Sequence, residues 1–246
     1  YKEDPQNNYS QDKENSLFII YIIFIFFILA EFFLNDFPKH NLDFFHEGEW
    51  LSPAYHYIQT SEMWTGSLFI HGLFYDLIKP IISWKLFGTI SIGSVRFLDN
   101  CLVLITKLAI LILSYQITNI QKFNEAQKIV FFTIITIVGL KLIKYGLGYN
   151  YFTYRDISLL IILSLSINLF KNNSLNLAAS FLLGFIVPFS FFLVIDRGIY
   201  SLIALSIIIF FIFINKKHIS LLMVFLGFII SILFVIYIFP KDELLG

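Results

Sequence analysis

Long apolar runs alternate with short polar connectors along most of the chain. A run of about 18 or more apolar residues can cross a bilayer as a helix. The pattern predicts about seven such spans. Their expected ranges are residues 17–34, 95–117, 129–147, 157–170, 175–195, 199–214 and 219–239. We therefore expect an all-α fold, a polytopic transmembrane helix bundle over residues 17–246, preceded by a polar N-terminal tail over residues 1–16 that is disordered or lies on the membrane surface.

A long interruption follows the first of these spans. Residues 35–65 are mostly polar, and the apolar segment 66–87 is broken by proline and by ionisable side chains. Such residues are costly in a helix that faces lipid. We therefore expect residues 35–94 to form an outer loop that carries short interfacial helices. The breaks in the apolar segment are His71, Asp76, Lys79, Pro80 and Lys85.

Composition supports a membrane protein and excludes other classes. The chain is 58% hydrophobic and 14% charged, with a mean hydropathy of +0.79, whereas soluble domains carry about 25% charged residues. Its formal net charge is +0, which argues against a nucleic-acid partner. The single cysteine, Cys101, excludes an internal disulfide framework. We expect the lipid bilayer to be the main partner of the chain, and the oligomeric state stays open.

The polar connectors divide into two sets that face opposite sides of the membrane. The set at 121–128, 171–174 and 215–218 carries five lysines and one acid, and the positive-inside rule assigns it to the cytoplasm. The loops around Asp43, Tyr149, Arg197 and Lys241 then face outward. The cytoplasmic set holds Lys122, Lys128, Lys171, Lys216 and Lys217 with Glu125.

The outer side also carries positive charge at the ends of predicted spans. Lys141 and Lys144 are three residues apart, so they share a helix face. These lysines, with Arg155 and Arg197, either extend to lipid headgroups or form a pocket for a phosphate group. Asp196 and Arg197 either neutralise each other at a tight turn or line a polar cavity.

The outer loop gathers three carboxylates and a histidine between residues 43 and 49. A carboxylate there could act as a general base on a hydroxyl acceptor. Glu47 and Glu49 could instead hold a divalent cation, Mg or Mn, although the sequence does not require a cofactor. The third interpretation is a solvated acidic loop with no catalytic or metal-binding role. The residues concerned are Asp43, His46, Glu47 and Glu49.

Two short sequence stretches resemble a known superfamily. The first is His46-Glu47-Gly48-Glu49-Trp50-Leu51 with Ala54 after it, and the second is His71-Gly72-Leu73 followed by Pro80, Phe87-Gly88 and Arg96. In this order they are similar to motifs of the GT-C type membrane glycosyltransferases, which use polyprenyl-phosphate sugars. The resemblance covers roughly residues 17–120. The chain departs from the family where His46 stands in place of the first acid of an acidic pair. Members of the family are usually longer, so the chain could be a fragment.

The resemblance implies a transferase that takes a sugar from a polyprenyl-phosphate donor on the non-cytoplasmic side. The acceptor would be a lipid, a glycan or a protein. Glu47 would be the catalytic base, with Asp43 as second choice and His46 and Glu49 beside it. The resemblance further implies a binding site for the departing lipid phosphate, formed by Lys141, Lys144, Arg155, Asp196, Arg197 and His71.

Two other classes of function remain open. A transporter or flippase would also need charged residues at helix ends, and a structural membrane partner would need no chemistry at all. The chain has neither a convincing internal repeat nor a glycine-rich phosphate loop. Abundant Ile, Phe, Asn and Lys are typical of an AT-rich genome. We therefore expect a bacterial inner membrane, with the active site facing outward.

Overall fold

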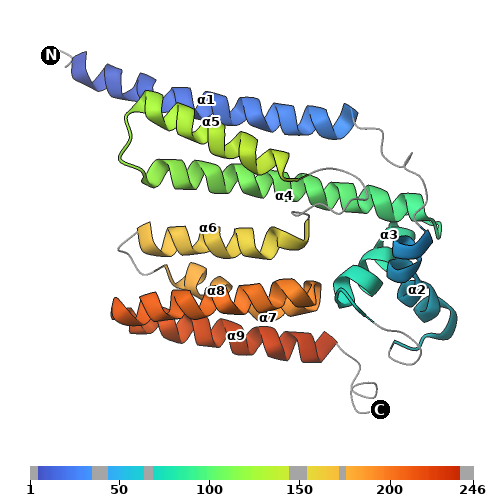
Figure 1. The fold of residues 1–246 in the computed structure, drawn as a ribbon. Coiled ribbons are helices and arrows are strands. Elements are labelled where there is room, and N and C mark those ends of the chain that lie inside the picture. The colour runs from blue at the N-terminus through green and yellow to red at the C-terminus, as the bar shows by residue number, and fades with distance from the viewer. Residues whose placement is uncertain (1–4, 35–43, 64–68, 144–153, 172–175, 239–246) are drawn as a thin grey trace.

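The structure, a computed structural model, describes residues 5–34, 44–63, 69–143, 154–171 and 176–238. Within these ranges the chain is helical and forms no β-strand (Figure 1). The helices are α1 (Pro5–Leu34), α2 (Phe44–Thr60), η1 (Phe74–Ile78), α3 (Lys79–Phe87), α4 (Ile92–Ile120), α5 (Glu125–Lys141), η2 (Tyr154–Asp156), α6 (Ile157–Lys171), α7 (Leu177–Leu193), α8 (Ile195–Ile214) and α9 (His218–Ile238).

Four helices in the described ranges are long and apolar enough to cross a membrane. They are the Ser16–Leu34 part of α1, all of α4 and α8, and the His218–Tyr237 part of α9. The helix α7 is also apolar but shorter. This confirms the expectation of an all-helical protein, and it indicates an integral membrane protein. Helices α5 and α6, of 17 and 15 residues, lie where the sequence predicts further spans.

Side-chain caps explain several of the helix ends. Ser91 accepts a hydrogen bond from the backbone N–H of Ser94 at the start of α4. Asn124 and Gln127 form a reciprocal capping box at the start of α5. The first helix differs from expectation, because α1 begins at Pro5 and the residues predicted as a tail continue it as helical backbone.

The long helices lie side by side, and each runs opposite to the long helix before it in the chain (Figure 1). Helix α4 packs against α1, α5 and α6, and α7 packs against α6, α8 and α9. Because the directions alternate, α2, η1 and α3 lie at the same end of the bundle as η2 and the junction between α7 and α8. We call this end of the bundle the polar end. It contains most of the ionisable side chains described below.

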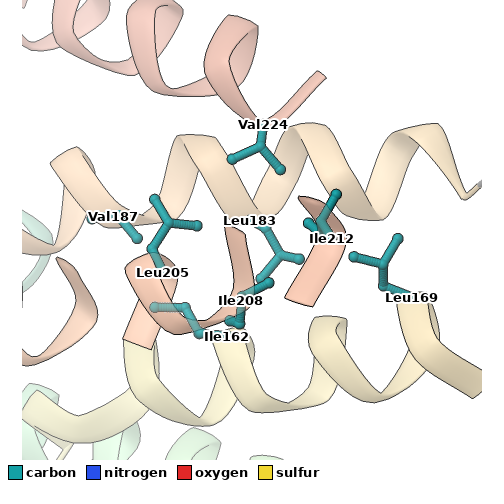
Figure 2. Close-up of a cluster of buried hydrophobic side chains, with 8 residues drawn as sticks. All are labelled: Ile162, Leu169, Leu183, Val187, Leu205, Ile208, Ile212 and Val224. Carbon is teal, nitrogen blue, oxygen red and sulfur yellow. The ribbon is translucent and has the colours of Figure 1, made fainter. Parts of the chain in front are cut away.

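Two apolar clusters hold the bundle together. One joins α6, α7, α8 and α9 around Leu183, which is fully buried (Figure 2). The other joins α1, α4 and α5 around Phe132, whose ring lies against Tyr21, Phe24 and Tyr115. Because lipid is as apolar as these side chains, close van der Waals packing rather than removal from water stabilises such contacts between spans. This packing fixes the helices that carry the polar end.

Candidate functional site

The first feature of the polar end is an ion pair between α2 and α4. The guanidinium of Arg96 donates from Nε to Oε1 of Glu47 at 2.6 Å and from Nη2 to Oε2 at 2.8 Å. Glu47 is 3% exposed and Arg96 is 7% exposed. A bidentate pair of this kind is strong and fixes orientation. Glu47, the base predicted from sequence, therefore binds an arginine through both of its oxygens.

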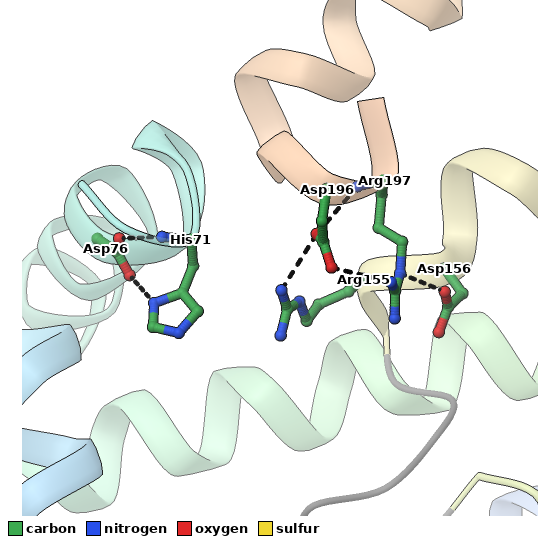
Figure 3. Close-up of polar contacts among 6 residues, drawn as sticks. All are labelled: His71, Asp76, Arg155, Asp156, Asp196 and Arg197. Carbon is green, nitrogen blue, oxygen red and sulfur yellow. Dashed lines mark hydrogen bonds and ion pairs between the residues drawn. The ribbon is translucent and has the colours of Figure 1, made fainter. Parts of the chain in front are cut away.

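The second feature is a histidine held by a buried aspartate. The backbone N–H of His71 donates to Asp76 Oδ2 at 2.8 Å, and the ring Nδ1 lies 3.0 Å from Asp76 Oδ1 (Figure 3). Asp76 is 1% exposed and belongs to η1, a single π-helical turn. Such turns occur frequently at functional sites. The two contacts fix both the backbone and the ring of His71.

The segment that carries His71 is tied to the junction of α7 and α8. The backbone N–H of Ile195 donates to the carbonyl of His71 at 3.0 Å. Gly72 has a φ of +133° and lies so close to the junction that an added Cβ would stand 2.8 Å from the Leu193 carbonyl oxygen. Only glycine meets both conditions without strain.

Replacing Gly72 with alanine is therefore expected to lower stability by about 1–3 kcal/mol through backbone strain and displacement of the junction. SDS-induced unfolding in mixed micelles measures this loss. Gly88→Ala is the matched control, because Gly88 also has a positive φ, of +66°, but nothing lies within 4 Å of an added Cβ. An equal loss in both variants would show that the contact with Leu193 has no effect.

The third feature is a chain of ion pairs between η2 and α8. Asp196 pairs with Arg155 at 3.2 Å and with Arg197 at 2.9 Å, and the Nε of Arg197 lies 2.6 Å from Oδ1 of Asp156 (Figure 3). The Asp196 side chain is 45% exposed, whereas that of Asp156 is 6% exposed. The two arginines thus share one accessible carboxylate at the start of α8.

The fourth feature is a buried lysine beside aromatic rings. Lys79 is fully buried, and its Nζ donates to Asp99 Oδ1 and to Tyr154 Oη, each at 2.8 Å. The same Nζ lies 4.0 Å from the centroid of the Tyr75 ring. Burial raises the pKa of Tyr75 and of Tyr154 above the ordinary value of a phenol, so both hydroxyl groups stay protonated.

Tyr75 connects these features. Its ring centroid lies 5.0 Å from that of His71 and 5.3 Å from that of Trp50, and it stacks on Tyr154 at 5.8 Å. The guanidinium carbon of Arg155 lies 5.5 Å from the same centroid. His71 and Arg155 are therefore neighbours of a single ring.

The structure thus gathers several of the residues predicted from sequence. Five of them lie at the polar end, namely Glu47, His71, Arg155, Asp196 and Arg197. Glu49 is half-buried on α2, and Lys141 is exposed at the end of α5. Asp43, Lys144 and the side chain of His46 lie outside the described residues.

Sequence reasoning missed the partners of these residues. It treated Lys79 and Asp76 only as breaks in an apolar segment, and it did not single out Asp99. The sequence feature that could have indicated them is an ionisable residue within an otherwise apolar run, since such a residue usually belongs to a functional site or an ion pair. For the proposed metal site, no group of three or more His, Cys, Asp or Glu that could hold a metal ion occurs in the described part of the chain. Both carboxylate oxygens of Glu47, which the proposed metal site would use, instead accept hydrogen bonds from Arg96.

Comparison of the chain with protein-family models, with curated proteins and with solved structures found no match.

Proposed function

We propose that the chain is an integral membrane glycosyltransferase of GT-C type. In this proposal it transfers a sugar from a polyprenyl-phosphate carrier to a lipid, glycan or protein acceptor. One observation carries the proposal. Arg155 in its ion pair, His71 bound to Asp76, and the ring of Tyr75 lie together at one end of an apolar bundle. Sugar transfer needs such a set, because charge develops on the departing phosphate while the acceptor loses a proton.

The proposal includes a topology of seven spans. Helices α5, α6 and α7 would cross the membrane beside α1, α4, α8 and α9, against which they pack. The polar end would face the non-cytoplasmic side of a bacterial inner membrane, since the connectors at the opposite end carry five lysines and one acid. The lipid carrier could then reach the site from the outer leaflet.

The arginine pairs offer a place for the lipid phosphate. A sugar linked to a lipid phosphate is a phosphodiester with one negative charge. It can replace the Asp196 carboxylate between Arg155 and Arg197 without changing the net charge of the cluster. Because Asp196 is 45% exposed, its side chain can turn toward water when the phosphate binds. Guanidinium groups bind phosphate through paired hydrogen bonds, which favours this exchange.

The test is transfer of a radiolabelled sugar from a panel of polyprenyl-phosphate donors by the purified chain in proteoliposomes. We expect labelled product with the wild type. Arg155→Met should raise the donor KM by about tenfold or more, because one charge-assisted contact with phosphate contributes about 1.5–3 kcal/mol. Lys122→Met is the control, since Lys122 is an exposed cation at the opposite end of the bundle. Absence of product with every donor would overturn the proposal.

One observation favours transport as a second candidate. Lys107 lies midway along α4, is 1% exposed, and donates to Glu31 of α1 at 2.7 Å. Ionisable residues within spans often mark the path of an ion or a charged headgroup. In the Glu31→Gln variant, a transporter would carry its ion or charged headgroup into proteoliposomes more slowly. A transferase would keep its sugar transfer in that variant.

A further inference from the structure

The two nitrogens of the His71 ring differ in their surroundings. Nδ1 faces the buried carboxylate of Asp76 at 3.0 Å, and the backbone N–H of His71 binds the other oxygen of the same carboxylate. Nε2 has no hydrogen-bond partner among the described residues, and the side chain is 20% exposed. With Asp76 ionised, Nδ1 carries the proton of the neutral ring and Nε2 carries the lone pair. The ring therefore presents a basic nitrogen in a fixed direction.

We propose that His71, oriented by Asp76, is the proton acceptor of the sugar transfer and that Glu47 is not. This inference rests on the proposed function, which it deepens by assigning the base. His71 is the catalytic residue, because its Nε2 would contact the acceptor hydroxyl. Asp76 is a positioning residue that acts through the ring.

The position of His71 suits this role. Its ring and the Arg155 guanidinium both lie against Tyr75, and Figure 3 shows Arg155 extending from η2 toward the side on which His71 lies. An acceptor hydroxyl at His71 and a donor phosphate at Arg155 would thus meet beside one aromatic ring. The hydrogen bond from Ile195 to the His71 carbonyl fixes this segment to the start of α8, where Arg197 lies.

Glu47 is less suited to accept the proton. Both of its oxygens accept hydrogen bonds from Arg96, and the pair is buried. Protonating Glu47 would leave the Arg96 guanidinium buried without its counter-charge, which is costly. The ion pair between Glu47 and Arg96 would have to break at each turnover. His71 needs no such opening, since no described residue binds its Nε2.

The acceptor hydroxyl gives its proton to Nε2 of His71, and its oxygen forms a bond to the anomeric carbon of the sugar. The bond between that carbon and the phosphate oxygen breaks, and its electron pair leaves with the lipid phosphate. The imidazolium formed on His71 is stabilised by the Asp76 carboxylate, and it later releases the proton to water.

The experiment compares kcat and KM of the full chain and the His71→Asn variant in proteoliposomes, with a radiolabelled polyprenyl-phosphate sugar as donor. The asparagine amide can still donate to Asp76 in place of Nδ1, so the fold should persist, but it offers no basic nitrogen. We expect kcat to fall by about 10²–10⁴-fold with little change in KM for the donor. His218→Asn is the control, because His218 is exposed at the opposite end of the bundle.

A second variant separates chemistry from structure. His71→Ala removes the ring, and added imidazole should restore part of its transfer, whereas imidazole should not affect His218→Asn. Transfer by His71→Asn at close to the wild-type rate, or failure of imidazole to rescue His71→Ala, would overturn the assignment of the base while leaving the proposed function intact. A wild type that transfers no sugar from any donor would overturn both.

Discussion

Replacing Glu47 with glutamine should destabilise the protein by about 3–5 kcal/mol, the usual cost of removing one partner from a buried ion pair. The loss arises because Arg96, only 7% exposed, would keep its charge without the carboxylate that binds it at 2.6 and 2.8 Å. The glutamine amide can accept from only one guanidinium nitrogen. Helices α2 and α4 would then lose a buried ion pair that joins them at the polar end.

SDS-induced unfolding in mixed micelles measures this loss. Glu49→Gln is the control, since Glu49 is half-buried on the same helix two residues further along. The double variant Glu47→Gln/Arg96→Met should recover much of the stability, because neither charge then remains buried alone. A Glu47→Gln variant as stable as the wild type would show that the ion pair with Arg96 does not stabilise the protein. If that variant also lost all transfer, Glu47 would be the base after all.

The second large effect is expected at the crossing of α7 and α9, which run in the same direction (Figure 1). A Cβ on Gly184 would overlap the backbone carbonyl of Val224, and a Cβ on Gly227 would overlap that of Phe181. Both clashes are with backbone, so no side chain can move aside to relieve them. Small residues at such crossings let two helices of a membrane protein approach closely.

Gly184→Leu should therefore force α7 and α9 apart and lower stability by about 3 kcal/mol, the upper part of the range for overpacking. Gly48→Leu is the control, because nothing lies within 4 Å of an added Cβ at that position. The same unfolding assay compares the two variants. Equal stability of Gly184→Leu and the wild type would show that the helices do not approach as closely as the structure indicates.

The positions of the long helices could largely be predicted from the sequence, because each apolar run is a local signal. The expected range 157–170 and the observed α6, Ile157–Lys171, differ by one residue at the C-terminal end. Helix α4 was harder to delimit. The sequence predicts its start at residue 95, whereas the Ser91 cap starts the helix at Ile92. Apolar runs locate a helix, but capping side chains set its ends.

The candidate site could be predicted only in part, since its pairings join residues far apart in the sequence. The acidic segment draws attention to Glu47, but nothing near it indicates its partner Arg96, which lies 49 residues further along. Lys79 and Tyr154 are 75 residues apart, and only the packing of α3 against α4 and of η2 against α4 brings them together. Charge in an apolar run shows that a partner exists without showing which residue it is.

The most direct test of this account measures transfer per folded molecule in two variants, Glu47→Gln and His71→Asn. Glu47 clamps α2 to α4, and His71 is the proposed proton acceptor. We expect Glu47→Gln to lose stability but to keep most of its turnover per folded molecule. His71→Asn should keep its stability and lose turnover by about 10²–10⁴-fold. The reverse pattern, a stable but inactive Glu47→Gln beside an active His71→Asn, would contradict the assignment of His71 as the proton acceptor.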